Sequence, residues 1–302
     1  MRAQRALGVV VVSTALAALL GAAATSASAS GRPVTRPAVV PGSRYLALGD
    51  SITFGFREPT TVPAPNYLNA SSFIGYPQLV GAALRLRVAN ASCSGETSSS
   101  LINTSGPSNG CTNHAPPITA PTQLYRANFP LHVRYKGSQL SYAVKYLRSN
   151  RNVRLVSLEF GANDLFYCQA TTKDGCGSTA EQQAVLTTVR NNIRTTLSAI
   201  RHKARYRGQI VIVNYYSLDY RSAFITGIVQ ALNQAQDSAG GPFGVLIANG
   251  YGQFYQGSLH SGANPCTAGL LTQLGKPGSC GVHPSYAGQS LLALSVERAI
   301  HH

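Results

Sequence analysis

The sequence predicts one α/β domain of three layers (α/β/α), with a mostly parallel sheet of about five strands between two layers of helices. Short apolar runs recur along the chain, and segments with helical periodicity lie between them. This alternation is typical of a parallel sheet covered on both faces. No linker composition or internal repeat interrupts residues 43–302, so we assign them to a single domain.

Apolar runs mark the predicted strands, and polar segments rich in Gly, Ser, Thr and Pro mark the predicted loops. The strands are Tyr45–Leu48, Arg87–Ala91, Leu155–Phe160, Ile210–Tyr215 and Val245–Ala248. The helices are Tyr76–Leu86, Gln139–Leu147, Thr179–His202, Ala223–Gln236 and a last one from Ser285 to Ile300. We expect long loops over Glu96–Pro130 and Gly250–Gly281.

The segment Thr179–His202 carries the clearest helical pattern. Ser178 and Glu181 match a capping box, in which each side chain accepts a hydrogen bond from a free backbone N–H at the start of the helix. Apolar residues then recur at helical spacing and define a buried face, namely Leu186, Val189, Ile193, Leu197 and Ile200.

The first residues, 1–29, have the composition of a secretory signal peptide. Arg2 and Arg5 precede an apolar run from Ala6 to Ala24, and Ala27-Ser28-Ala29 is a small-x-small cleavage sequence. A membrane anchor is the alternative, but the run ends in small residues, and no later stretch is long and apolar enough to span a bilayer. We therefore expect secretion after cleavage near Ala29, with a disordered lead-in over residues 30–42.

Six cysteines in an exported chain predict three disulfide bonds. Many connectivities are open to them, and proximity in the sequence favours three local pairs. These are Cys93–Cys111, Cys168–Cys176 and Cys266–Cys280. No metal site is expected, because no CxxC motif or close Cys/His set is present.

The chain is strongly basic, with 25 Lys and Arg, 10 Asp and Glu, and a net charge of +15. Such a surface could attract anionic lipid headgroups or anionic cell-wall polymers. The basic residues are scattered and no aromatic-basic motif accompanies them, so no specific nucleic-acid partner is expected. No Gly-rich phosphate loop or dinucleotide fingerprint is present, and we expect no cofactor.

Gly49-Asp50-Ser51 directly follows the first apolar run. Open α/β sheets build their sites outside the carboxyl ends of their strands, which is where this serine would lie. A serine there can be a nucleophile if a base and oxyanion donors come from elsewhere in the chain. Three later blocks supply candidates: Gly95 in Cys93-Ser94-Gly95-Glu96, Asn163 in Gly161-Ala162-Asn163-Asp164, and His283 in Val282-His283-Pro284.

In this order, Ser51, Gly95, Asn163 and His283 resemble the four blocks of the GDSL, or SGNH, hydrolases, over residues 44–302. The resemblance implies a flavodoxin-like SGNH fold and acyl hydrolysis, with Ser51 as nucleophile and His283 as base. It also implies an oxyanion hole made by the backbone N–H groups of Ser51 and Gly95 and the side-chain amide of Asn163. Secretion and the local cysteine pairs are most similar to exported actinobacterial GDSL lipases, esterases and phospholipases.

The sequence departs from the family pattern just before the histidine. Many members carry an Asp three residues before it, where this chain has Cys280. A disulfide-bonded cysteine cannot orient an imidazole through its side chain. We therefore predict a Ser51–His283 dyad in which the backbone carbonyl of Cys280 accepts the imidazole Nδ1–H. The rival is a remote acid such as Asp219 or Asp237, which has no positional support.

The expected protein is a secreted, monomeric serine esterase or lipase that acts on fatty-acyl esters, including glycerides or phospholipids. One alternative is a carbohydrate esterase that removes acetyl groups. A noncatalytic cationic protein that binds cell surfaces is an alternative of another class, but a pure binder needs neither a base nor oxyanion donors. The segment Gly106-Pro107-Ser108-Asn109-Gly110 also matches the G-x-S-x-G nucleophile elbow. It lies in a polar loop without the strand and helix that this motif requires.

Overall fold

The computed structural model describes residues 36–113, 124–276 and 278–302. Residues 36–302 form one unit around a five-stranded parallel sheet whose order is β2-β1-β3-β4-β5. The strands are β1 (Arg44–Gly49), β2 (Arg87–Asn90), β3 (Val153–Glu159), β4 (Gln209–Val213) and β5 (Leu246–Ala248). The predicted strands are therefore confirmed to within a few residues at their ends.

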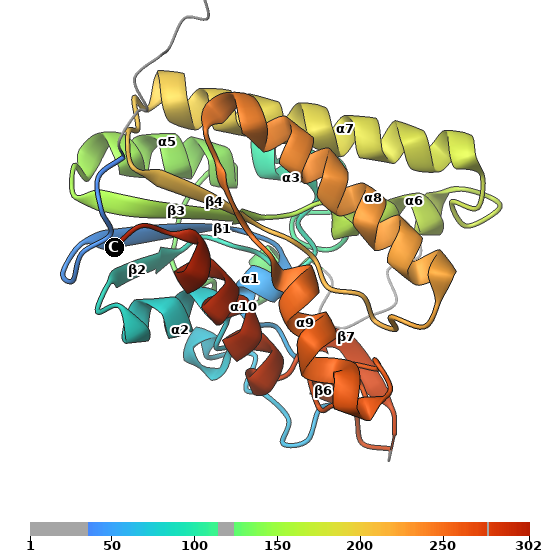
Figure 1. Ribbon diagram of the computed structural model, residues 1–302. Coiled ribbons are helices and arrows are strands. Elements are labelled where there is room, and N and C mark those ends of the chain that lie inside the picture. The colour runs from blue at the N-terminus through green and yellow to red at the C-terminus, as the bar shows by residue number, and fades with distance from the viewer. Residues whose placement is uncertain (1–35, 114–123, 277) are drawn as a thin grey trace, which may run out of the picture. The chain divides into compact units, whose positions relative to one another are not determined.

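Helices lie on both faces of this sheet, which confirms the three-layer α/β/α fold (Figure 1). One face is covered by α2, α9 and α10, and the other by α5, α7 and α8. The helices are α1 (Ser51–Phe54), α2 (Tyr76–Ala83), α3 (Ser98–Ile102), α4 (Tyr125–Asn128), α5 (Gln139–Ser149), α6 (Ala162–Thr171), α7 (Thr179–Ser198), α8 (Ala223–Gly240), α9 (Gly250–Ser258) and α10 (Tyr286–Ala299).

The three central strands β1, β3 and β4 are almost wholly buried. Their continuous apolar runs follow from this position, because a parallel strand covered on both faces has no solvent side on which to place polar residues. Helix α7 buries Val189, Ile193 and Leu197, as its periodicity predicts, and Ser178 caps its first turn. Ala199–Lys203 continues this helix as a π-helical turn.

The structure corrects the loop predicted over Gly250–Gly281. Helix α9 occupies its start, and two short antiparallel strands, β6 (Leu271–Gln273) and β7 (Cys280–Pro284), form a separate hairpin. Helices α3 and α4 likewise lie within Glu96–Pro130, and α6 follows β3. These elements are short or rich in polar residues, so their sequences show too little periodicity to predict them.

All three predicted disulfides are present, as Cys93–Cys111, Cys168–Cys176 and Cys266–Cys280. The first closes the segment that contains Gly95. The third joins the segment after α9 to the start of β7, which carries His283. The disulfides therefore restrain polar segments on which predicted site residues lie.

The predicted signal peptide lies outside the described residues. Of the predicted lead-in, residues 36–42 are described and contact the domain: Val39 is buried, and its N–H donates to the carbonyl of His301 at 3.0 Å. Within the described ranges, no helix has the length and hydropathy needed to cross a membrane.

Candidate active site

Ser51 lies at the carboxyl end of β1, as its position in the sequence predicts. It is the first residue of α1, and it is 8% exposed. Asp50 caps this short helix, because its Oδ1 accepts a hydrogen bond from the N–H of Ile52 at 2.9 Å. The strand end and the helix cap together fix the backbone on both sides of the serine.

The structure brings Ser51 and His283 together. The Nε2 atom of His283 lies 3.0 Å from the Oγ atom of Ser51. His283 belongs to β7, and the following turn leads through Ser285, the N-cap of α10. The hydrogen bond has the geometry that a base needs to accept a proton from the serine hydroxyl.

A carboxylate completes this arrangement, so the predicted dyad is wrong. The Nδ1 atom of His283 lies 2.7 Å from Oε1 of Glu58, which replaces the carbonyl of Cys280 as the partner of the imidazole. A carboxylate binds a ring N–H more strongly than a neutral carbonyl does. The rival acids lie elsewhere: Asp219 pairs with Arg221, and Asp237 accepts from Asn214.

The hairpin β6–β7 holds Glu58 against the histidine. Oε1 of Glu58 also accepts the backbone N–H of Val282 at 3.0 Å, and Oε2 accepts the hydroxyl of Thr272 in β6 at 2.5 Å. Burial alone would raise the pKa of Glu58, but the hydrogen bond and charge of His283, with the bond from Thr272, lower it to about 2. Glu58 is therefore ionised at neutral pH.

Asn163 lies at the start of α6, beside Asp50. Its Nδ2 donates to Oδ2 of Asp50 at 3.3 Å, and the same oxygen accepts the hydroxyl of Tyr215 at 2.6 Å. The preceding Gly161 has a φ of +134°, a conformation that favours glycine. The backbone turns sharply there and directs α6 away from the end of β3.

Gly95 occupies a turn with a φ of +80° that packs against Asn109. A Cβ atom at this position would lie 2.5 Å from the carbonyl oxygen of Asn109, so only glycine fits without movement. Among the described residues, neither the N–H of Gly95 nor that of Ser51 donates to a protein acceptor. Both N–H groups are therefore without a hydrogen-bond partner in the described part of the protein.

Ser51, Asn163 and His283 line a common cavity of about 450 Å³. Most of its remaining wall is apolar, and helices α6 and α8 supply the larger part of the apolar side chains. The apolar residues on these helices are Leu165, Phe166, Phe224, Ile225, Ile228, Val229 and Leu232. Gly95 does not line the cavity, but hydrogen bonds through Asn109 connect Gly95 to Asn163.

Ser108 of the G-x-S-x-G match is buried, and its hydroxyl is used in structural hydrogen bonds. Its hydroxyl donates to the carbonyl of Gly95 at 3.1 Å and accepts the N–H of Cys111 at 2.9 Å. No strand precedes it and no helix follows it directly. The motif therefore forms a turn, as its polar context predicts.

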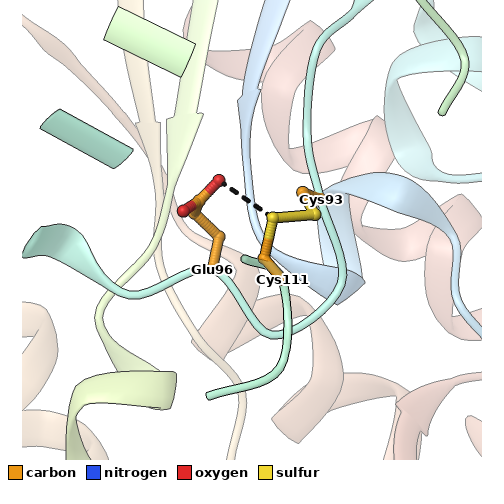
Figure 2. A group of neighbouring side chains, drawn as sticks. All are labelled: Cys93, Glu96 and Cys111. Atoms are coloured by element: carbon orange, nitrogen blue, oxygen red, sulfur yellow. Dashed lines mark hydrogen bonds between the residues drawn. A yellow bond between two sulfur atoms is a disulfide. The ribbon is translucent and has the colours of Figure 1, made fainter. Parts of the chain in front are cut away.

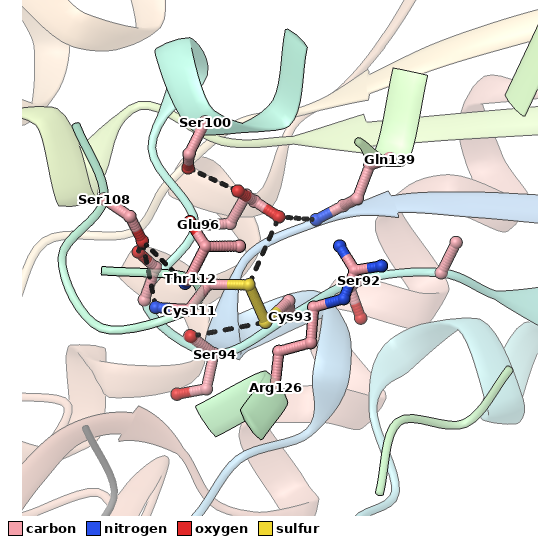
Figure 3. The surroundings of a disulfide bond; sticks show 12 residues. Ser92, Cys93, Ser94, Glu96, Ser100, Ser108, Cys111, Thr112, Arg126 and Gln139 are labelled. Atoms are coloured by element: carbon pink, nitrogen blue, oxygen red, sulfur yellow. Dashed lines mark hydrogen bonds between the residues drawn. A yellow bond between two sulfur atoms is a disulfide. The ribbon is translucent and has the colours of Figure 1, made fainter. Parts of the chain in front are cut away.

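Two clusters of side chains have the spacing of metal ligands within the described part of the chain. They are Cys93, Glu96 and Cys111 (Figure 2), and Cys168, Cys176 and Glu181. In both clusters the cysteines are bonded to each other, and a disulfide offers no thiolate to a metal ion. Figure 3 shows that Glu96 instead accepts hydrogen bonds from Ser100 and Gln139.

Glu58 is the site residue that the sequence analysis does not predict. It follows Ser51 by only a few residues, in a segment with no recognisable motif. Its contact with His283 joins positions 225 residues apart in the chain. One signal was available in the composition: with only 10 acidic residues in the whole chain, each carboxylate near Ser51 deserves consideration as a partner for the histidine.

A serine hydrogen-bonded to a histidine that is hydrogen-bonded to a carboxylate is the arrangement typical of serine hydrolases, and it occurs on several unrelated folds. The chain belongs to the GDSL-like lipase/acylhydrolase family, whose model matches residues 47–291. A comparison with curated proteins finds no match.

Solved structures show the same fold. LAE5, an α/β hydrolase from the metagenome of Lake Arreo, is 16% identical with a TM-score of 0.50, over 86% of this chain and 95% of its own. A catalytic mutant of Axe2, an acetylxylan esterase from Geobacillus stearothermophilus, is 15% identical with a TM-score of 0.51, over 87% of this chain and 96% of its own. Similarity at this level of identity supports the fold alone.

Proposed function

We propose that the protein is a serine esterase that hydrolyses carboxylic esters of fatty acids through an acyl-enzyme on Ser51. One observation carries this proposal: Ser51, His283 and Glu58 are linked by hydrogen bonds, and Ser51 and His283 line an apolar cavity. The three linked side chains supply the chemistry of acyl transfer, and the cavity supplies space for an apolar acyl group.

In the first half of the reaction, Ser51 Oγ attacks the ester carbonyl carbon while His283 Nε2 accepts the hydroxyl proton. Glu58 holds the Nδ1–H and stabilises the imidazolium. The tetrahedral intermediate then collapses, the ester C–O bond breaks, and the alcohol leaves with the proton from Nε2. Water repeats these steps on the acyl-enzyme, releases the fatty acid and restores the serine.

Three donors are proposed to stabilise the oxyanion of each tetrahedral intermediate. They are the backbone N–H groups of Ser51 and Gly95, which have no acceptor among the residues that the structure describes, and the Nδ2–H of Asn163 that does not bind Asp50. Preorganised donors of this kind matter because they strengthen as charge develops on the oxygen. Removing one costs about 10²–10³-fold in turnover in comparable enzymes.

The cavity supports an acyl group longer than acetyl. Burial of each methylene stabilises a bound chain by roughly 0.8 kcal/mol, so apolar walls between α6 and α8 favour long acyl groups. The alternative is an acetyl esterase acting on carbohydrate, which is the activity named for the similar Axe2 structure. An acetyl group would leave most of a cavity of about 450 Å³ unfilled.

A panel of p-nitrophenyl esters, from acetate to palmitate, tests the proposal. We expect kcat/KM to rise from acetate to esters of medium or long acyl chains. The Ser51→Ala variant should lose several orders of magnitude in kcat, and the exposed Ser105→Ala variant should retain full activity. A fluorophosphonate probe should label Ser51. Activity on acetate alone would favour the carbohydrate esterase, and unchanged hydrolysis by Ser51→Ala would exclude this mechanism.

We also infer export of the chain. Three disulfides support this inference, because such bonds persist in oxidising compartments. Determining the N-terminal sequence of the protein recovered from culture medium would test cleavage near Ala29.

A further inference from the structure

The segment Gly106–Gly110 contacts two of the three residues proposed to supply oxyanion donors, Gly95 and Asn163. The backbone N–H of Asn109 donates to the carbonyl of Gly95 at 2.9 Å. The side-chain Nδ2 of Asn109 donates to Oδ1 of Asn163, also at 2.9 Å. One residue therefore joins the turn of Gly95 to the amide of Asn163, although these lie in separate parts of the sequence.

The direction of these hydrogen bonds is fixed by Asp50. An ionised carboxylate only accepts hydrogen bonds, so Asn163 must turn Nδ2 toward Asp50. Its Oδ1 then faces Asn109, which must present a donor. If Asn109 offered an acceptor instead, it would compete with Asp50 for the N–H groups of Asn163, and the amide would no longer be held with its Nδ2 on the serine side.

The surrounding segment keeps Asn109 in place. The Cys93–Cys111 disulfide closes the loop that contains Gly95 and Asn109, and the Ser108 hydroxyl accepts the N–H of Cys111 (Figure 3). The same hydroxyl donates to the carbonyl of Gly95. Asn113 holds the same turn from the other side, accepting the N–H of Ser108 at 2.8 Å and donating to the carbonyl of Gly106 at 2.9 Å.

We propose that Asn109 is a positioning residue of the oxyanion hole, which holds the Asn163 amide with its Nδ2 directed at the strand-end crevice and anchors the turn of Gly95. This inference rests on the proposed oxyanion role of Asn163. Asn109 itself touches neither the serine nor the histidine in the described contacts, so it acts through Asn163 and Gly95.

The test is a double-mutant cycle between Asn109 and Asn163 on a p-nitrophenyl ester, at a pH where the ester is hydrolysed fastest. Asn109→Asp replaces the donor by an acceptor of the same shape, so kcat should fall about 10²-fold with little change in KM. Asn109→Ala removes the donor without adding charge and should give a smaller loss of kcat. In the Asn163→Ala background, either change should cost less than about threefold more, because the amide on which it acts is gone.

Asn113→Asp is the matched control. It alters the same turn and introduces the same charge, but Asn113 touches neither Asn163 nor Gly95. Its effect on kcat should be equal in the wild-type and Asn163→Ala backgrounds. Melting temperatures of all variants separate a loss of folding from a loss of turnover.

Three results would overturn the inference. Equal losses from Asn109→Asp with and without Asn163 would show that the new charge acts directly, and a rise in KM at constant kcat would show a role in substrate binding. If Asn163→Ala leaves kcat unchanged while Ser51→Ala abolishes it, the esterase mechanism stands and the role of Asn109 falls.

Discussion

At the scale of single residues, Glu58 determines the orientation and the tautomer of the His283 imidazole. The pKa of Glu58, lowered to about 2, keeps it ionised at neutral pH, so a negative charge faces Nδ1 of His283 there. That charge fixes the tautomer in which Nδ1 carries the proton and Nε2 faces Ser51. Glu58 therefore both orients the His283 imidazole and places a negative charge beside it. A Glu58→Gln variant separates these two contributions, because it keeps the shape of the side chain and removes the charge.

We predict that Glu58→Gln lowers kcat by roughly 10²–10⁴-fold while the protein remains folded. Glutamine keeps the shape, but it removes the charge that stabilises the imidazolium and can present its NH₂ to the ring. Steady-state kinetics on a p-nitrophenyl ester measures the effect. Asp219→Asn is the control, because Asp219 pairs with the exposed Arg221 outside the site, and it should retain wild-type activity. Comparable losses in both variants would contradict a specific role for Glu58.

The sequence predicts Ser51, Gly95, Asn163 and His283 as candidate site residues but not Glu58, and the reason is physical. The first four follow strands or precede a helix, positions at which local chemistry limits the choice of residue. Glu58 owes its place to tertiary contacts with Thr272 and Val282. No periodicity or capping rule reports a contact between a loop and a hairpin so distant in sequence.

At the scale of elements, the sequence predicts long buried strands well and short hairpins poorly. The strands β1, β3 and β4 are buried on both faces, and this environment dictates their apolar composition. The three-residue strand β6 is defined by its pairing with β7 and by one backbone hydrogen bond from Val62 to Gln273. The candidate site depends on both kinds of element, since β1 positions Ser51 and the hairpin positions His283 and Glu58.

Helices α6 and α8, which line the cavity, lead to a prediction about the acyl chain length of the preferred ester. Ile228 of α8 lines the cavity, and a larger side chain there would fill the space proposed for the acyl chain. We predict that Ile228→Trp lowers kcat/KM for p-nitrophenyl laurate relative to acetate by about tenfold or more.

Gln234→Trp is the matched control for Ile228→Trp, because it places the same indole on the exposed side of α8. It should leave the ratio of laurate to acetate hydrolysis unchanged. An equal shift in both variants would indicate a general effect on the helix, and no shift in Ile228→Trp would place the acyl chain elsewhere.

At the scale of the whole molecule, the few acids are divided between the surface and the interior. Of the 10 acidic residues, four are buried: Asp50, Glu96, Glu159 and Asp164. Burial raises the pKa of each of them, to about 7 for Glu96 and about 6 for Asp164. The ordinary pKa values are 4.5 for Glu96 and 3.8 for Asp164. At a pH between the ordinary and the raised pKa of each group, the folded protein therefore keeps a proton that the unfolded chain has lost.

These shifts predict a protein that is more stable at pH 5 than at pH 8. Where the folded state binds more protons, the free energy of unfolding falls as pH rises. Glu58 has the opposite sign: its lowered pKa adds stability above its ordinary value of 4.5, and this is lost as pH falls toward 2. The midpoint of urea unfolding should therefore decrease from pH 5 to pH 8.

Glu96→Gln provides the internal comparison for this pH dependence. Glutamine cannot ionise and keeps a carbonyl to accept from Gln139, so the difference between pH 5 and pH 8 should narrow. A midpoint that rises with pH, or a variant with an unchanged difference, would contradict this account.

The distance in sequence between the members of the triad has a consequence for biosynthesis. Ser51 and Glu58 are synthesised before His283, which follows Ser51 by 232 residues. Until the β6–β7 hairpin is made, the nascent chain lacks His283, the proposed proton acceptor of Ser51. A premature stop codon anywhere before the hairpin would therefore release a product without hydrolytic power, however much of its sheet had formed.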